Sequence, residues 1–283
     1  MSKRIFKCVL RMAVFLFVLL STSSANANNE EVAWDKLQGL GQVESFAITN
    51  PSKTKNTFPY HIFVRLPEEY KKSDKQTFPV LYLLDGGTNF PLMVGMYTHL
   101  RWMKDIPPMI IVGISYGTHD WRQGNDRSHD FTAPSKEREH WGGAAVFEEF
   151  VEHRLMPIIQ QKYLVDKDKQ VLFGQSLAGQ FALYSSMYGK APFYGVIASN
   201  PALYRNLDYF KRPLSARTHR PKVFVSIAEF DDQKYKIPST EWVGFWQKQQ
   251  PDWQANFVTL AGQNHLSATP DTIRNGLIWL FKE

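Results

Sequence analysis

A serine lies where an apolar segment meets a helix-forming segment. The stretch 170–179 reads Gln-Val-Leu-Phe-Gly-Gln-Ser-Leu-Ala-Gly, with Gly174 two residues before Ser176 and Ala178 two residues after it. Small residues there let a strand and a helix approach around a sharp turn that exposes the serine hydroxyl as a nucleophile. Alanine stands at 178, where glycine is usual. A helix-capping serine is the alternative, but the strand and helix patterns on either side favour a nucleophile.

A histidine near the C-terminus is suitably placed to be the base for this serine. Of the eight histidines, His265 lies in Gly-Gln-Asn-His-Leu-Ser, after the last predicted strand and before the last predicted helix. A neutral imidazole at this place in the chain can accept the serine proton. A structural loop histidine is the alternative.

Three carboxylates follow the penultimate predicted strand, where the chain order serine, acid, histidine places the third group. Glu229, Asp231 and Asp232 come directly after Ala228. Counting three positions past Ala228, as in a G-x-x-D turn with alanine for glycine, selects Asp231. Glu229 is the main alternative and Asp232 the other, because a one-residue shift of the strand end changes which carboxylate faces the imidazole. The acid would fix the tautomer of His265 and stabilise its charged form.

Attack on an acyl carbonyl also needs two backbone N–H groups directed at the oxyanion. One usually comes from the residue after the nucleophile, here Leu177, and the other from the loop after the third strand. The segment 78–87, Phe-Pro-Val-Leu-Tyr-Leu-Leu-Asp-Gly-Gly, ends in paired glycines. We predict Gly87 as the second donor, with Gly86 next in order. An ordinary Asp-Gly turn is the alternative.

The elements that must position these residues follow an α/β pattern. From about residue 78 onward, short apolar runs alternate with longer amphipathic stretches, which is typical of parallel strands joined by crossover helices. Two earlier runs, 43–48 and 60–66, predict an antiparallel hairpin at the sheet edge. We expect a mostly parallel central sheet with helices on both faces. The predicted strands are 79–84, 109–115, 170–174, 195–199, 222–228 and 256–260, and the predicted helices lie near 88–103, 144–163, 177–188, 239–249 and 269–282.

One connecting segment is unusually long. Residues 116–141 are rich in Gly, Asp, Arg, Ser and His and follow a strand that has a buried pattern. Such a segment is either a substrate-side loop or a packed excursion on the surface. The first interpretation is favoured.

The N-terminus is typical of a secretory signal peptide. A basic start precedes an apolar run from Val9 to Leu20, interrupted by Arg11, and a polar tail that ends in Ala25-x-Ala27. An uncleaved membrane anchor is the alternative, but the run is shorter than the roughly 20 residues that a bilayer span needs. We predict a signal peptide at 1–27, no stable membrane anchor after cleavage, and one exported domain at 28–283, most simply periplasmic.

Composition excludes several classes of function. Removing residues 1–27 takes away four basic residues and no acidic ones, which lowers the net charge from +6 to +2. With no Lys/Arg cluster in the mature chain, this charge gives no support to nucleic-acid binding. Cys8, the one cysteine, lies in the predicted signal peptide. A mature chain would therefore have no cysteine nucleophile, disulfide or thiolate zinc site.

These motifs resemble the putative-esterase family of α/β-hydrolases, which includes esterase D, feruloyl esterases, mycolyltransferases and siderophore esterases of the enterochelin type. The strongest likeness is to its exported, siderophore-esterase-like branch. The resemblance runs from about Tyr60 to the C-terminus and rests on segments 78–86, 109–114, 127–132, 174–179 and 199–201 and on His265. It implies the α/β-hydrolase fold. These motifs are specific for the family and not for a substrate.

By this resemblance the protein would cleave or transfer carboxylic esters without a metal or an organic cofactor. Arg127 and Asp130 would help to shape the substrate pocket or brace its loop, and a salt bridge of structural value is the alternative. Some siderophore esterases lack the acid and use a Ser-His pair. Because carboxylates are present after the penultimate predicted strand here, we predict a complete triad of serine, histidine and acid.

Aromatic residues make up 14% of the chain, and four of them, Trp102, Trp121, Trp141 and Tyr204, fall in or near predicted substrate-side loops. Aromatic side chains suit an aryl or catecholate ester, and Trp141 is the candidate that we single out for substrate binding. Tryptophan and tyrosine are equally common as core and surface anchors.

We expect Ser176 to attack a small ester with His265 as its base, and water to hydrolyse the acyl-enzyme. Acyl transfer to a sugar or lipid alcohol is the alternative from the same chemistry. A non-catalytic binding protein on the same fold is the alternative from another class. That alternative predicts loss of the serine or the histidine, and both are present.

Overall fold

The computed structural model describes residues 38–50, 58–73, 75–216 and 220–282. The predicted signal peptide lies outside the described residues, so its cleavage and the export of the chain stay predictions. Among the described residues, no helix combines the length and the apolar character that crossing a membrane requires.

In the described part of the chain, eight strands form one sheet in the order β1-β2-β4-β3-β5-β6-β7-β8. Strand β2 pairs antiparallel with β1 and with β4, and all the other pairs are parallel. This is the predicted α/β-hydrolase sheet with its N-terminal hairpin at one edge. The strands are β1 (Gln42–Ile48), β2 (Tyr60–Leu66), β3 (Phe78–Leu83), β4 (Ile110–Ser115), β5 (Val165–Gln175), β6 (Gly195–Ser199), β7 (Lys222–Ala228) and β8 (Ala255–Leu260).

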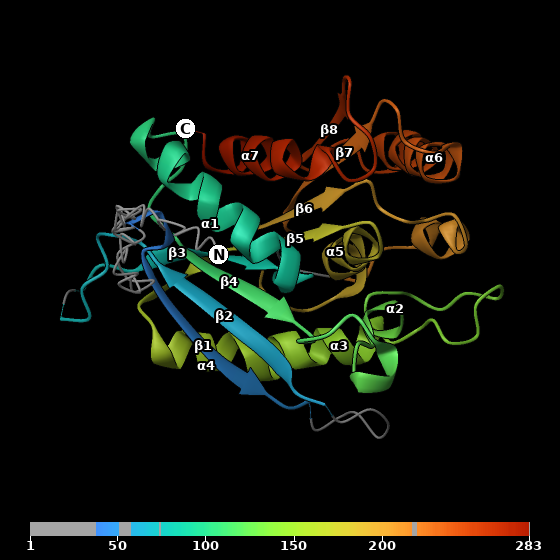
Figure 1. The fold of residues 1–283 in the computed structure, drawn as a ribbon. Helices are drawn as coiled ribbons and strands as arrows, with labels where there is room; N and C mark the ends of the chain where they lie inside the picture. Colours follow the sequence, from blue (N-terminus) through green and yellow to red (C-terminus); the bar gives the residue numbers. More distant parts are fainter. Residues whose placement is uncertain (1–37, 51–57, 74, 217–219, 283) are drawn as a thin grey trace, which may run out of the picture. The chain divides into compact units, whose positions relative to one another are not determined.

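Helices cover both faces of the sheet, as Figure 1 shows. The helical elements are η2 (Gln38–Leu40), α1 (Gly86–Trp102), η3 (Trp121–Gln123), α2 (Arg127–Asp130), α3 (Ala144–Phe150), η4 (Val151–Leu155), α4 (Met156–Lys162), α5 (Leu177–Tyr188), η5 (Leu207–Lys211), α6 (Gln233–Gln249) and α7 (Ala268–Phe281). Along β3, Leu81 and Leu83 pack with α1 and α7, whereas Val80 and Tyr82 pack with α3 to α6. Both faces of the inner parallel strands are therefore buried, which explains their continuous apolar runs, whereas the edge strand β8 is only partly buried.

Two predicted helices differ from the observed ones, and a proline is involved in each. The predicted helix 144–163 is interrupted by η4, a π-helical turn just before Pro157, whose missing N–H removes one bond of the regular ladder. Helix α6 begins at Gln233 and not at 239, with Pro238 inside it. The side chain of Asp232 accepts a hydrogen bond from Lys234 N and so caps this earlier start.

The long segment after β4 is anchored by a buried carboxylate. Asp130 is 1% exposed, and its Oδ2 accepts hydrogen bonds from the hydroxyls of Tyr60 at 2.6 Å and Tyr116 at 2.9 Å. Burial, reinforced by the charge of Asp130, raises the pKa of both phenols, so they stay protonated and donate. The segment therefore has a packed stem, in addition to residues that face the site described below.

A second buried carboxylate ties α3 to the end of α5, the helix that follows Ser176. Glu148 Oε1 accepts hydrogen bonds from the backbone N–H groups of Lys190 and Ala191, each at 3.0 Å, and from the Ser185 hydroxyl at 3.2 Å. Glu148 is 5% exposed, so this carboxylate is largely shielded from water and depends on these donors.

We predict that Glu148→Ala lowers the free energy of unfolding by about 2–4 kcal/mol, because several donors lose a charged acceptor at once. Urea unfolding followed by circular dichroism measures this change. Glu149→Ala removes an exposed carboxylate from the same helix and should change the stability by less than about 0.5 kcal/mol. Equal losses in the two variants would contradict the assigned role of Glu148.

Candidate active site

Ser176 occupies a sharp turn between the end of β5 and the start of α5. Its backbone angles are φ 60° and ψ −116°, a conformation that non-glycine residues rarely adopt. A Cβ added at Gly174 would collide with the carbonyl of Ala178, and one at Gly179 would lie 2.9 Å from Ser199 O. Close packing thus requires glycine at 174 and 179. Ala178 is fully buried, and its methyl group is accommodated.

The structure brings the predicted serine, histidine and acid together. His265 Nε2 lies 2.9 Å from Ser176 Oγ, and His265 Nδ1 lies 2.7 Å from Asp231 Oδ2. A carboxylate only accepts hydrogen bonds, so Nδ1–H donates to Asp231 and Nε2 is left to accept the serine proton. The Asp231 side chain is 1% exposed and the His265 side chain 22% exposed, so the acid is shielded while the imidazole is accessible.

The other two carboxylates after β7 are directed elsewhere. Glu229 Oε2 accepts a hydrogen bond from Gly262 N at 2.8 Å. Asp232 Oδ1 accepts one from Lys234 N at 3.0 Å, and its Oδ2 lies 3.2 Å from Lys234 Nζ. Of the three candidates, Asp231 is the one that the structure hydrogen-bonds to His265, as the count from Ala228 predicts.

Two side-chain amides that the sequence analysis did not single out hold the backbone of His265. Its carbonyl oxygen accepts hydrogen bonds from Gln175 Nε2 at 2.8 Å and Asn200 Nδ2 at 3.3 Å. Asn200 is 1% exposed, has φ 44°, and its Oδ1 accepts a hydrogen bond from Ala228 N at 2.7 Å. The amide of Asn200 therefore links the loop that carries the histidine to the end of β7, just before the acid.

The same turn after β6 also holds the nucleophile. Ser176 N donates to Ser199 O at 2.9 Å, and Ala202 N donates to Ser176 O at 3.0 Å. In the sequence, this turn is marked only by Ser199-Asn200-Pro201 at the end of a predicted strand. That segment does not predict what the side chain of Asn200 contacts. Only the order of strands shows that this turn lies between those that carry Ser176 and Asp231.

Both predicted oxyanion donors lie at helix N-termini. Leu177 is the first residue of α5 and Gly87 the second residue of α1, so neither N–H has an acceptor within its helix. A Cβ at Gly86 would collide with the backbone of β4, whereas one at Gly87 would meet only Ser115 Oγ, at 3.2 Å. Glycine at 86 is thus required for packing, while Gly87 lines a cavity. The positive ends of the two helices favour a developing negative charge.

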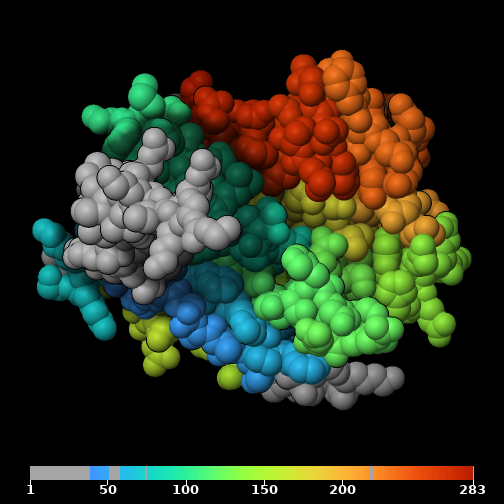
Figure 2. Space-filling view, viewed as in Figure 1, coloured from blue at the N-terminus to red at the C-terminus, as the bar shows by residue number. Residues whose placement is uncertain are grey.

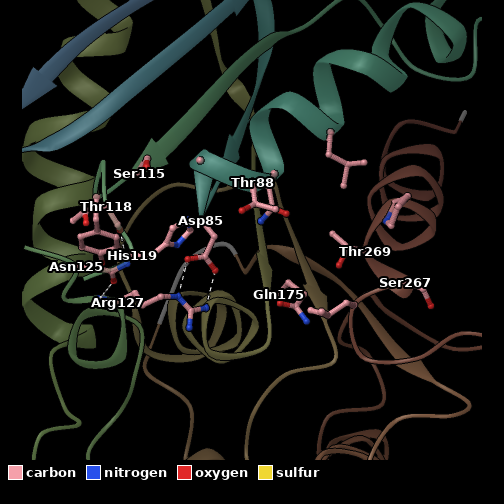
Figure 3. A pocket seen from close by; sticks show the side chains of 16 residues that line it. Asp85, Thr88, Ser115, Thr118, His119, Asn125, Arg127, Gln175, Ser267 and Thr269 are labelled. Atoms are coloured by element: carbon pink, nitrogen blue, oxygen red, sulfur yellow. Dashed lines mark hydrogen bonds and ion pairs between the residues drawn. The ribbon is translucent and has the colours of Figure 1, made fainter. Parts of the chain in front are cut away.

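This cavity has a volume of about 580 Å³ and lies beside the serine and histidine. Gln175 and Leu266, the chain neighbours of Ser176 and His265, line it together with the start of α1 and the loop after β4. In Figure 2, that loop and the red C-terminal segment flank a recessed part of the surface. The polar residues labelled in Figure 3 are Asp85, Thr88, Ser115, Thr118, His119, Asn125, Arg127, Gln175, Ser267 and Thr269.

Arg127 lines the cavity as half of a bidentate ion pair. Its Nε lies 2.8 Å from Asp85 Oδ1 and its Nη2 2.7 Å from Asp85 Oδ2, as the dashed lines in Figure 3 show. Burial opposes the charge on Arg127, but the hydrogen bonds and charge of Asp85 outweigh this effect and raise its pKa. The pair joins the loop after β4 to Asp85, two residues before Gly87. The cation is thereby neutralised, and the loop is braced.

The other two predicted substrate-binding residues lie outside this cavity lining. Asp130 is buried with Tyr60 and Tyr116, so it braces the stem of the loop and does not pair with Arg127. Trp141 is 8% exposed and packs edge-on against Tyr204, with ring centroids 6.1 Å apart. The structure therefore places Arg127, and neither Asp130 nor Trp141, at the cavity. Within the described ranges, no group of three or more His, Asp or Glu side chains is arranged to hold a metal ion.

Comparison with known proteins shows that the chain is similar to enzymes that cleave esters. Residues 55–273 match the family described as "Putative esterase". The chain is 26% identical over 243 residues to the ferri-bacillibactin esterase BesA of Bacillus subtilis, covering 77% of this chain and 83% of BesA. It is 28% identical over 210 residues to the siderophore triacetylfusarinine C esterase of Aspergillus fumigatus, covering 69% and 66%. The structure of the siderophore hydrolase EstB from Aspergillus nidulans shares the fold, with a TM-score of 0.72, 20% identity and coverage of 90% and 97%.

We predict that Asp231→Asn slows the labelling of Ser176 by a fluorophosphonate by about 10²- to 10⁴-fold, because an amide cannot hold the required imidazole tautomer. Mass spectrometry of the intact protein over time measures the labelling. Glu229→Gln is the matched control, since its side chain bonds to Gly262, and its rate should stay within about twofold of wild type. The reverse ranking of the two variants would assign the acid to Glu229.

Proposed function

Because this chain belongs to the putative-esterase family, whose members include the siderophore esterases that it resembles, we propose that it hydrolyses a small carboxylic ester through an acyl-enzyme on Ser176. The observation that carries the proposal is the hydrogen-bonded series from Ser176 Oγ through the two nitrogens of His265 to the buried Asp231. A helix-capping serine needs no such partners.

In the proposed reaction, Ser176 Oγ attacks the ester carbonyl while its proton passes to His265 Nε2. The N–H groups of Leu177 and Gly87 hold the negative oxygen of the tetrahedral intermediate. His265 then gives its proton to the departing alcohol as the C–O bond breaks. Water attacks the acyl-enzyme with His265 again as base, which releases the acid and restores Ser176. Asp231 keeps its charge throughout and stabilises the imidazolium.

We propose a siderophore or aryl ester as the substrate class. The names of the two relatives, a ferri-bacillibactin esterase and a triacetylfusarinine C esterase, support this class. The cavity beside the serine supports it further, because about 580 Å³ accommodates one arm of a larger ester. Its lining offers hydroxyl and amide groups, and its arginine is already paired with Asp85. Such a lining suits a neutral, hydrogen-bonding group better than a free carboxylate.

We predict that Ser176→Ala lowers hydrolysis of every ester that the wild type accepts by about 10⁴-fold or more. The panel is short p-nitrophenyl esters, a feruloyl ester and a catecholate trilactone, tested with residues 28–283. Ser45→Ala, an exposed serine on the edge strand β1, should match the wild type. Full activity in Ser176→Ala would refute the mechanism. Ester products formed with added alcohols, in place of free acid, would show an acyltransferase.

A further inference from the structure

An aromatic side chain packs against one face of the His265 imidazole. The ring of Tyr235 is stacked on it, with ring centroids 4.1 Å apart and an angle of 26° between the planes. Tyr235 is partly buried. It lies on α6, outside the residues that the sequence analysis singled out.

The first turn of α6 places this ring. Asp231 binds His265 immediately before the helix, the side chain of Asp232 caps it through Lys234 N, and Tyr235 N donates to Asp232 O at 2.9 Å. Asp231 lies just before the N-cap residue Asp232, whose backbone is extended (φ −60°, ψ 139°), so the short connection into the helix, and not helical spacing, places the two side chains. The acid at 231 and the ring at 235 can therefore reach the same imidazole from one rigid segment.

Neighbouring aromatic rings hold Tyr235 in place. Tyr204 packs edge-on against it at 5.3 Å, and Trp141 packs edge-on against Tyr204 at 6.1 Å. Lys234 Nζ lies 5.0 Å from the centre of the Tyr235 ring. Burial raises the pKa of Tyr235, which outweighs the opposing effect of Lys234, so the phenol remains neutral. A row of three aromatic rings thus extends from the histidine to the loop after α2.

The hydrogen bonds of His265 constrain one motion of its ring only weakly. Asp231 holds Nδ1 and Ser176 meets Nε2, so both bonds act in the plane of the imidazole. They constrain rotation about an axis through the two nitrogens only weakly, because hydrogen-bond geometry tolerates such a tilt. A ring stacked on one face blocks this tilt and keeps water from that face.

We propose that Tyr235 is a positioning residue for His265, which fixes the tilt of the imidazole and stabilises the imidazolium formed when Ser176 gives up its proton. The face of an aromatic ring carries negative charge density and attracts a cation. The gain is larger after proton transfer than before it, so it accelerates the chemical step. This inference rests on the proposed esterase function.

The test compares kcat and KM for Tyr235→Phe, Tyr235→Leu and Tyr235→Met with a p-nitrophenyl ester. We expect kcat of the Leu and Met variants to fall about 5- to 30-fold, or about 1–2 kcal/mol at 1.36 kcal/mol per tenfold, with KM changed less than about twofold. Tyr235→Phe keeps the ring and should retain kcat within about twofold of wild type. A general loss of packing would change KM and lower the temperature of unfolding along with kcat, so KM and thermal unfolding separate it from a loss of positioning.

The control is Ile237→Ala on the same helix, where the side chain is 61% exposed, with thermal unfolding of every variant to show that it is folded. Wild-type kcat in the Leu and Met variants would overturn the inference. So would a rise in KM alone, which indicates a substrate contact, or failure of Phe to preserve kcat, which indicates a role for the hydroxyl. A wild type inert to both esters and fluorophosphonate would instead refute the proposed function, and this inference with it.

Discussion

The hydrogen bond between His265 Nδ1 and the buried carboxylate of Asp231 sets the geometry on which the rest of the site depends. It selects the tautomer whose Nε2 can accept a proton, and it requires that two loops far apart in the sequence stay in register. The fold meets this requirement by holding the backbone as well as the ring of His265. The amides of Gln175 and Asn200 bind its carbonyl oxygen, while the first turn of α6 carries the acid.

Parallel strands make this convergence possible, because their carboxyl ends meet at one edge of the sheet. Strands β3, β5, β6, β7 and β8 are consecutive neighbours in the sheet. The segments that follow them carry, in the same order, Gly87, Ser176, Asn200, Asp231 and His265. Each residue is thus one strand away from the next along the edge. Helices α1 and α5 begin at the same edge, which brings their unbonded N–H groups to the place where negative charge develops.

The kind of ligand that the cavity beside this edge can accept depends on charge pairing as well as on the shape of the cavity. An unpaired arginine would make the cavity selective for anions, but Asp85 meets the guanidinium of Arg127 with both oxygens. The same contact joins the loop after β4 to the segment that leads into Gly87. Below it, Asp130 anchors the stem of the loop through two tyrosine hydroxyls. The charged residues Arg127 and Asp130 therefore act through different partners, one at the cavity and one in the core.

Local patterns in the sequence determined the α/β-hydrolase fold, most element boundaries, the candidate serine and histidine, and a set of three candidate acids, by their order along the chain. Such inference works where a residue's role follows from the strand that it ends, as for Ser176 after β5 and His265 after β8. Asn200, Gln175 and Tyr235 could not be assigned in this way, because their partners are 65, 90 and 30 positions away along the chain. The pairing of Arg127 with Asp85 could not be predicted for the same reason, because the two residues are 42 positions apart. Only the tertiary structure decides which side chains meet across neighbouring strands, since those contacts depend on strand order and helix start points, and spacing along the chain records neither.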